Sequence, residues 1–185
     1  MIKVSVVIPA YNGEKYIEQL KQSLSIQTYA PAEIILVDDA SIDQTVSLAQ
    51  KSGFKILKQE SNRGPASARN RGAQAAQGEL ICFTDTDCIP DKNWIKNIVT
   101  TFNQNPSIDV VVGETKIVPT SSLERWIALL GFPGGGALGF QKVWKVTEDG
   151  YTTSFSSCNI GVKKTFFERF GYFDESFPVP AGEDT

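Results

Sequence analysis

The stretch VSVVIPAYNGEKYI, residues 4–17, decides the fold class, because its hydrophobic pattern changes from one period to another within a few residues. Its first seven residues form an almost continuous apolar run rich in β-branched side chains, which is typical of a strand buried on both faces. After a polar turn, apolar side chains recur at helical spacing at Tyr16, Ile17, Leu20 and Leu24. The stretch therefore predicts a strand over 4–10 and a helix over 14–27.

The same succession of strand and helix repeats along the first 113 residues. Further strands are predicted over 33–39, 54–58, 79–85 and 109–113. One intervening helix is predicted to begin at a capping box of Ser41 and Gln44 and to end at Gly53, and the next runs from the loop SNRGP to Gly78. A third helix presents the apolar face Trp94, Ile95, Ile98, Val99 and Phe102. This alternation predicts an α/β fold, a mostly parallel sheet with helices on both faces.

Polar residues follow the predicted strands at the end where ligands of such sheets bind. They fall in the segments Pro9–Asn12, Asp38–Ser41, Asn62–Arg71 and Asp85–Asp87. Four loops of this kind on one edge of a sheet indicate a binding site.

The stretch FTDTDC, residues 83–88, places Asp85 and Asp87 two positions apart at the end of a strand. Like charges raise each other's pKa and repel, so the pair is costly unless a cation or a proton is shared. Mg²⁺ and Mn²⁺ suit such a pair, because they take one or two protein carboxylates and leave sites for phosphate oxygens and water. An acidic loop without a ligand is the alternative, since Asp favours turns and strand ends.

The stretch NRGPASARNRG, residues 62–72, offers Gly64 for close backbone approach and three arginines for phosphate or carboxylate groups. Arg69 and Asn70 are predicted on the opening turn of a helix, where side chains and backbone amides face an anion together. A solvated basic helix start is the alternative. The sequence lacks G-x-G-x-x-G and G-x-x-x-x-G-K-[ST], which argues against a Rossmann dehydrogenase and a P-loop nucleotidase.

Two further residues have two interpretations each. Tyr11 could stack on a planar ring or plug the core near the strand end. Asp39 could accept an imide N–H or cap the helix that follows it.

Composition limits the chemistry. The chain has 185 residues, 41% hydrophobic and 21% charged, which fits one globular domain. A net charge of −3 without a basic stripe argues against a nucleic-acid partner. The lack of histidine excludes Ser–His and Cys–His nucleophile pairs and histidine zinc sites. Three cysteines without metal-type spacing suit a reduced, cytoplasmic protein.

No segment has the roughly 18 apolar residues of a membrane span, and the first residues do not resemble a signal peptide. The most apolar stretch, 126–140, is broken by Pro133 and three glycines, and is expected to be a short helix running into a mobile loop. Peripheral association with the inner face of a membrane stays open. The glycine-rich residues 131–139 are a candidate lid over a ligand.

Five blocks resemble, in this order, the family 2 glycosyltransferases of the GT-A fold: VSVVIPAYNGEKYI, IILVDDASID, NRGPASARNRG, FTDTD and the terminal GEDT. The resemblance covers essentially the whole chain. It implies a single domain, 1–185, with a nucleotide-binding half over 1–113 and a less regular acceptor-side half over 114–185. It also implies transfer of a sugar from a nucleotide-diphosphate donor to an acceptor hydroxyl with inversion of the anomeric carbon, and the donor we favour is a UDP-sugar.

The resemblance also implies roles for particular residues. Those implied to bind the nucleotide sugar are Pro9, Ala10, Tyr11, Asn12, Glu14, Asp38, Asp39, Gly64, Pro65, Arg69, Asp85 and Thr86. Mn²⁺ or Mg²⁺ is expected on Asp87 and Asp85, although the family often has a third acid where this chain has Cys88. The implied catalytic base is Asp184, with Glu183 beside it.

The acceptor implied by the family is a hydroxyl of a glycan, a lipid-linked glycan or a protein. In relatives GEDT leads into further elements, so we interpret a chain ending at Thr185 as truncated. A nucleotide-sugar-binding module without activity is therefore an alternative. A signalling receiver with Asp85 as phospho-acceptor would leave VSVVIPAYNGEKYI unexplained, and a sugar nucleotidyltransferase would need a glycine-rich loop with lysine where this chain has PAYNGEKY.

Overall fold

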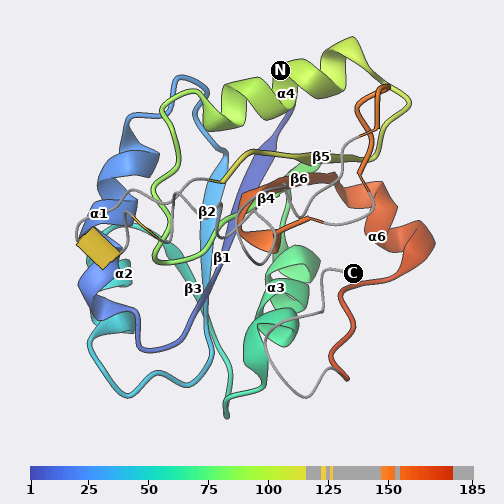
Figure 1. Ribbon diagram of the computed structural model, residues 1–185. Helices are drawn as coiled ribbons and strands as arrows, with labels where there is room; N and C mark the ends of the chain where they lie inside the picture. Colours follow the sequence, from blue (N-terminus) through green and yellow to red (C-terminus); the bar gives the residue numbers. More distant parts are fainter. Residues whose placement is uncertain (116–121, 124–125, 127–146, 153–154, 177–185) are drawn as a thin grey trace.

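The computed structural model describes residues 1–115, 122–123, 126, 147–152 and 155–176. Among these residues, six strands form one sheet in the order β3-β2-β1-β4-β6-β5 (Figure 1). The strands are β1 (Val4–Ala10), β2 (Glu33–Asp38), β3 (Lys55–Lys58), β4 (Leu80–Phe83), β5 (Val110–Val112) and β6 (Ile160–Lys163). β1 pairs in parallel with β2 and β4, and β2 pairs in parallel with β3, whereas β6 runs antiparallel to β4 and β5. The mostly parallel sheet predicted from the sequence is confirmed.

Helices cover both faces of this sheet (Figure 1). The described helices are α1 (Glu14–Ser25), α2 (Thr45–Lys51), α3 (Gly64–Ala75), α4 (Trp94–Gln104) and α6 (Lys164–Phe170), with a 3₁₀ turn, η1, at Ser157–Asn159. α1, α2 and α4 pack on one face, and α3 and α6 pack on the other. None of the helices in the described part of the chain combines the length and apolar character that crossing a bilayer requires.

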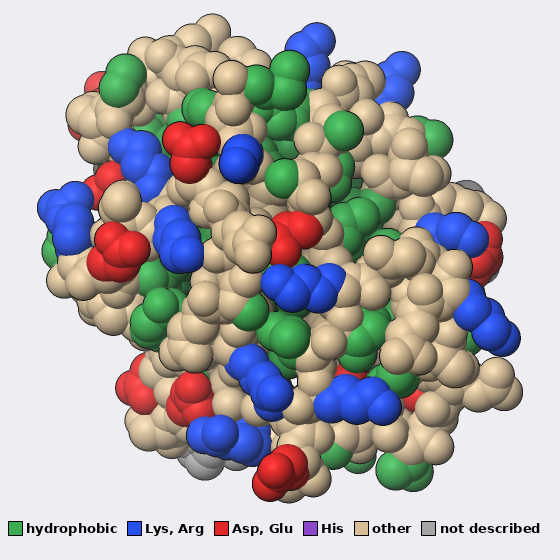
Figure 2. Space-filling model, turned by 180° about the vertical axis from the view of Figure 1, so that it is seen from behind, with side chains coloured by type: hydrophobic (Ala, Val, Ile, Leu, Met, Phe, Trp, Pro, Cys, Tyr) green, Lys and Arg blue, Asp and Glu red, His purple; other side chains and the backbone are tan. Residues whose placement is uncertain are grey.

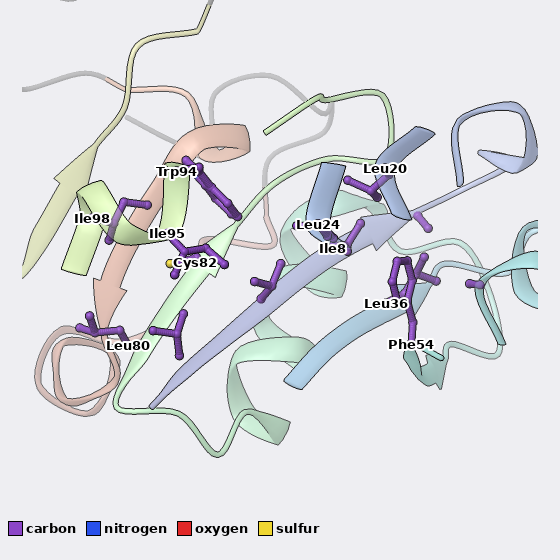
Figure 3. Packing of buried hydrophobic residues seen from close by; sticks show 14 of the residues in the cluster. Ile8, Leu20, Leu24, Leu36, Phe54, Leu80, Cys82, Trp94, Ile95 and Ile98 are labelled. Carbon is purple, nitrogen blue, oxygen red and sulfur yellow. The ribbon is translucent and has the colours of Figure 1, made fainter. Parts of the chain in front are cut away.

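The two faces explain why the first strand is continuously apolar. Val4, Val6, Ile8 and Ala10 enter one hydrophobic cluster with α1 and α4, whereas Val7 enters a second cluster with α3 and α6. Every residue of β1 is buried. The close-up of the first cluster places Ile8 among Leu20 and Leu24 of α1 and Leu36 of β2, with Trp94, Ile95 and Ile98 of α4 over Leu80 and Cys82 (Figure 3).

The last two strands depart from the simple alternation of strand and helix. The predicted strand at 109–113 exists as β5, but it lies at the sheet edge and does not pair with β4. β6 lies between them. A Cβ atom on Gly161 of β6 would stand 2.4 Å from Ile98 Cγ2. Only glycine therefore allows α4 to approach this inserted strand so closely.

The predicted capping box at Ser41 and Gln44 is wrong. α2 begins at Thr45, and Asp43 Oδ1 accepts the hydrogen bond from the Thr45 backbone N–H at 2.9 Å. The Ser41 hydroxyl instead accepts a hydrogen bond from the backbone N–H of Asn12, at 2.9 Å. Ser41 therefore bonds to the loop after β1, although its spacing in the sequence predicted a bond at the start of α2.

Gly72 is a position on α3 where the structure does not tolerate added volume. A Cβ atom there would stand 2.3 Å from Val7 Cγ1 and 3.1 Å from Val37 Cγ2. Alanine normally stabilises a helix interior by about 1 kcal/mol relative to glycine. Because overpacking costs typically about 1–3 kcal/mol, we expect Gly72→Ala to lower the free energy of unfolding in urea. The exposed Gln74→Ala, two positions along the same helix, should change it by less than about 0.5 kcal/mol, and equal stability of both variants would contradict the packing argument.

Candidate functional site

Strand order places the predicted polar loops around one point of the sheet. From β1 the chain adds β2 and β3 on one side, and then returns to place β4 on the other side of β1. The loops after β1 and β4 therefore diverge at this switch point, and ligands of open α/β sheets bind in the crevice at such a point. We call residues 11–13, 39–44, 59–63 and 84–88, which follow β1, β2, β3 and β4, the strand-end loops.

The first two strand-end loops are tied to each other by side chains predicted to bind ligand. Asn12, in a left-handed conformation with φ of 49°, accepts a hydrogen bond from the Ile42 backbone N–H through Oδ1 at 2.9 Å. Glu14 Oε2 accepts a hydrogen bond from the Gln44 backbone N–H at 2.8 Å. The structure thus places Asn12 and Glu14 in bonds that shape the rim of the site.

Asp39 organises the loop that follows β3. Its carboxylate is buried, and Oδ1 accepts hydrogen bonds from Gln59 Nε2 and the Arg63 backbone N–H, both at 2.8 Å. Oδ2 accepts one from the Gly64 backbone N–H, also at 2.8 Å. Asp39 therefore caps α3, and the expectation that it might cap the following helix is wrong. Three donors use three of roughly four lone-pair positions, so among the described residues Oδ2 keeps a position for a further donor.

The backbone conformation at the start of α3 requires glycine at position 64. The φ of Gly64 is +86°, in the region that favours glycine, and this conformation turns its N–H toward Asp39 Oδ2. Pro65 follows at the start of α3, where a missing N–H costs nothing. The conformation of the loop after β3 is therefore fixed both by the backbone of Gly64 and by the hydrogen bonds to the Asp39 carboxylate.

Removing the Asp39 charge should destabilise the whole protein. The asparagine of an Asp39→Asn variant would present an NH₂ group toward at least one of the three donors, and hydrogen bonds to a charged group are worth about 1.5–3 kcal/mol. We expect this variant to lower the free energy of unfolding by about 2 kcal/mol, measured as a shift of the urea midpoint at unchanged slope. The exposed Glu60→Gln in the same loop is the matched control. An unshifted Asp39→Asn midpoint would contradict the assigned bonds.

Arg69 and Asp85 form an ion pair across the site. Arg69 Nη2 lies 2.9 Å from Asp85 Oδ1, with the arginine side chain 4% exposed and the aspartate side chain 30% exposed. Arg69 and Asn70 lie in the second turn of α3, so their predicted place on its opening turn is wrong. The guanidinium beside Asp85 offsets part of the repulsion that two neighbouring acids would otherwise suffer.

Asp87 is the exposed acid of the pair. Its side chain is exposed, and its Oδ1 lies 4.0 Å from Cys88 Sγ. Thr86, between the two acids, lies close to Gly13: a Cβ atom on Gly13 would stand 3.1 Å from Thr86 Oγ1. In the described part of the chain, no three Asp, Glu, Cys or His side chains come together as a cation site. Mg²⁺ and Mn²⁺ commonly keep several waters and bind through one or two carboxylates plus substrate phosphates. The residues present fit a cation shared with a phosphate-bearing ligand, not one enclosed by protein.

The remaining predicted residues take different positions. Pro9 and Ala10 are buried in β1, and the Ala10 carbonyl accepts the Asp39 backbone N–H at 2.8 Å. Asp38 is buried and accepts the Ser41 backbone N–H through Oδ1 at 3.3 Å. Tyr11 is 52% exposed, so the expectation that it might plug the core is wrong. An exposed ring at the end of β1 remains available for stacking on a ligand.

The predicted catalytic residues Glu183 and Asp184 lie outside the described residues. So does the glycine-rich segment 131–139 that was a candidate lid.

Gln59 is a site residue that sequence reasoning missed. It is buried at the end of β3, where it donates to Asp39 and accepts from Ser67 Oγ at 3.4 Å. The signal that could have found it is its position directly after a predicted strand, the same position that identified the other polar loops.

Two cysteines from distant parts of the chain meet beside the acid pair. The Cys158 thiolate accepts hydrogen bonds from the Cys88 thiol and from the Ser156 hydroxyl, whose Oγ lies 3.1 Å from Cys158 Sγ. These hydrogen bonds lower the pKa of Cys158 to about 7. The same pairing, together with burial, raises the pKa of Cys88. Cys158 is therefore the thiol expected to react first.

Alkylation by iodoacetamide should report this pairing. With a pKa of about 7, the rate at Cys158 should rise roughly tenfold between about pH 6 and pH 8 and then level off, because the thiolate is the nucleophile. Cys88→Ala removes the main donor, and should move the midpoint up toward the ordinary value of about 8.5. Peptide mass spectrometry separates the sites, with the fully buried Cys82 as an internal unreactive control. A midpoint that Cys88→Ala leaves in place would disprove the pairing.

Comparison with known proteins identifies the family of this chain. The model of glycosyl transferase family 2 matches residues 5–171. Over 115 residues the chain is 37% identical to glycosyltransferase GlyG of Streptococcus pneumoniae, covering 60% of this chain and 38% of GlyG. Over 123 residues it is 35% identical to poly(ribitol-phosphate) beta-N-acetylglucosaminyltransferase TarS of Staphylococcus aureus, covering 63% of this chain and 21% of TarS.

Solved structures extend the likeness to the three-dimensional fold. Residues 1–349 of S. aureus TarS in complex with UDP match with a TM-score of 0.73 and 26% identity, over 99% of this chain and 53% of that one. The UDP-GlcNAc complex of the same protein matches with a TM-score of 0.73 and 27% identity, over 99% and 51%. The chain thus spans about half of these TarS structures and less of the full relatives. The expected GT-A fold is confirmed.

Proposed function

Because the chain belongs to glycosyltransferase family 2, we propose that it transfers a sugar from a nucleotide-diphosphate donor to an acceptor hydroxyl. The observation that carries the proposal is that Asp39, the Arg69–Asp85 pair and Asp87 lie on or beside loops at the same end of the parallel strands, next to the switch point of the sheet. At this end of the sheet, these groups offer an acceptor for a base N–H, a carboxylate for sugar hydroxyls and a ligand for a phosphate-bound cation.

The donor proposed is a UDP-sugar. Asp39 Oδ2 suits the imide N–H of a base such as uracil, and the exposed Tyr11 ring suits stacking on that base. Uracil, thymine and guanine all carry an imide or amide N–H of this kind, so the geometry alone does not choose among them. The crystal structures of TarS hold UDP and UDP-GlcNAc, which favours uracil.

Asp85 and Asp87 take different roles in this proposal. The ion pair with Arg69 holds Asp85 in one orientation, which suits it to accept hydrogen bonds from ribose hydroxyls. The exposed Asp87 is the protein ligand for Mn²⁺ or Mg²⁺, together with the donor phosphates. A cation bound there would neutralise charge on the departing nucleoside diphosphate as a Lewis acid.

The acid–base chemistry is assigned to Asp184, with Glu183 beside it. A carboxylate within hydrogen-bond reach of the acceptor hydroxyl takes its proton as the oxygen attacks the anomeric carbon. Attack from the side opposite the leaving diphosphate gives inversion in a single displacement. The chain contains no histidine, and this mechanism needs none. The acceptor is proposed as a hydroxyl of a glycan, a lipid-linked glycan or a protein.

The charged side chains on the face opposite the view of Figure 1 indicate whether that face could bind a nucleic acid. Lys and Arg side chains are interspersed there with Asp and Glu side chains, and do not form one basic stripe (Figure 2). A surface of this kind offers no continuous track for a phosphate backbone.

Calorimetric titration of UDP, GDP and dTDP, each with and without Mn²⁺, tests the donor site. We expect UDP to bind at least about tenfold more tightly with Mn²⁺, which is roughly 1.4 kcal/mol of binding free energy. Failure of all three nucleotides to bind would overturn the proposal. Binding without Mn²⁺-dependent release of free sugar from UDP-sugars would favour the alternative of a nucleotide-sugar-binding module.

A further inference from the structure

A short segment near the end of the described chain is held by one buried side chain of α3. Asn70, 4% exposed, donates a hydrogen bond from Nδ2 to the Phe173 carbonyl at 2.8 Å. Its Oδ1 accepts the Phe173 backbone N–H at 2.9 Å. A single amide thus pairs with both backbone groups of one residue, 103 positions away in sequence. This segment was not recognised as part of the site from the sequence.

Glu175 links the same segment to the loop after β3. Its Oε1 accepts a hydrogen bond from Asn70 Nδ2 at 2.9 Å, and its Oε2 lies 3.0 Å from Arg63 Nη2. The backbone N–H of Arg63 is one of the three donors to Asp39. Arg63 therefore contacts the proposed base-binding carboxylate through its backbone and the C-terminal segment through its guanidinium.

An apolar contact fixes the other side of this segment. The Phe173 ring meets the Phe83 ring edge to face, with centroids 5.4 Å apart. Phe83 is the last residue of β4, two positions before Asp85. The segment Phe173–Glu175, which we call the docking turn, is thus held at three points. Those points lie on β4, on α3 and on the loop after β3.

The Arg63–Glu175 ion pair adds little to general stability, unlike the buried Asn70 hydrogen bonds and the Phe173 ring contact. The side chains of Arg63 and Glu175 are 61% and 37% exposed, and exposed ion pairs contribute about 0–1 kcal/mol. The docking turn is followed in sequence by residues 177–185, which include Glu183 and Asp184. Because the docking turn comes shortly before the proposed catalytic residues, these contacts can contribute to catalysis as well as to stability.

We propose that Asn70 and Glu175 are positioning residues that couple the donor site to the segment carrying the catalytic base. The inference rests on the proposed function and adds a mechanism for it. A nucleotide on Asp39 fixes the Arg63 loop, and Arg63 and Asn70 fix the docking turn. The docking turn comes in sequence shortly before the residues to which the base is assigned. Because a misplacement of about 1 Å can cost about 100-fold in rate, losing this anchor should affect turnover far more than nucleotide affinity.

Hydrogen–deuterium exchange of the whole chain with UDP and Mn²⁺ as probes tests the coupling without requiring activity. In the wild type, nucleotide is expected to slow amide exchange in peptides covering 172–176. The protection should shrink in Glu175→Gln, which keeps the side-chain shape but loses the ion pair. It should vanish in Asn70→Ala, which removes the amide itself, whereas the exposed Gln74→Ala on the same helix should behave as wild type.

Kinetics then separate positioning from folding. We expect Asn70→Ala and Glu175→Gln to lower kcat by at least about tenfold and about threefold respectively, with the UDP dissociation constant within about threefold of wild type. Glu175→Gln changes a partly exposed side chain and should fold normally, so it keeps the test valid if Asn70→Ala does not fold. Nucleotide binding that leaves exchange at 172–176 unchanged, or a wild-type kcat in both variants, would overturn the coupling. Absence of any nucleotide binding would instead overturn the proposed function.

Discussion

Asp184→Asn is expected to lower the rate of sugar transfer by about 10²–10⁴-fold, the range that general acid–base catalysis contributes. Asparagine has nearly the same shape as aspartate but cannot accept the proton of the attacking hydroxyl. Because the nucleotide and metal contacts are assigned to other residues and the substitution is isosteric, the dissociation constants of UDP and Mn²⁺ should stay close to those of the wild type. The transfer rate is measured at saturating donor, so that kcat alone reports the change.

Glu183→Gln is the matched control for this experiment. It removes the neighbouring carboxylate by the same isosteric change, and it should cost much less than Asp184→Asn if Asp184 is the base. A wild-type rate in Asp184→Asn together with a slow Glu183→Gln would transfer the role to Glu183. Two unaffected variants would show that neither residue takes the proton.

Asp87→Ala should abolish the Mn²⁺-dependent part of nucleotide binding. The ratio of UDP dissociation constants measured without and with Mn²⁺ should fall from at least about tenfold to about one, since the alanine variant lacks the exposed carboxylate that fits the cation. Metal-independent affinity should persist, because Asp39, Arg69 and Asp85 are untouched. An unchanged ratio would show that Asp87 is not the metal ligand.

The fold of the Asp87→Ala variant should survive. The side chain is exposed and its contact with Cys88 is long, so the free energy of unfolding should change by less than about 0.5 kcal/mol. The exposed Glu168→Ala on α6 controls for loss of an acid elsewhere on the surface. It should leave both stability and the Mn²⁺ dependence unchanged.

The parallel part of the sheet was predictable because the evidence for it is local. A continuous apolar run such as 4–10 indicates burial on both faces, and the structure buries every residue of β1. The position of β6 could not be predicted in the same way. Its four residues pair with β4, roughly 80 positions away, and the choice depends on packing between Gly161 and Ile98. No local pattern reports a contact of that kind.

In the site, too, local features could be predicted and long-range contacts could not. Spacing after strands found Asp39 and the Asp85–Asp87 pair, but it could not say what each carboxylate contacts. The pair was expected to need a shared cation, whereas the structure provides Asp85 with Arg69 as well. The bonds of Asp39 to the start of α3, 24 and 25 positions ahead, are likewise set by the fold. Residue type and position could be predicted, but not the partners.

The antiparallel insertion of β6 has a consequence for how the protein is made. In the described part of the chain, β5 pairs with β6, which is translated about 50 residues later. At a synthesis rate of roughly 5–20 residues per second, β5 waits about 3–10 s for that partner, and the outer edge of β4 waits about 4–16 s. β1 likewise waits for β4, which is translated about 76 residues later, but β6 can join the sheet only after all of β1 to β4 have been made. The parallel part of the sheet, β1 to β4, can therefore assemble on the ribosome first, with an open edge on β4 that β6 must reach before another chain does.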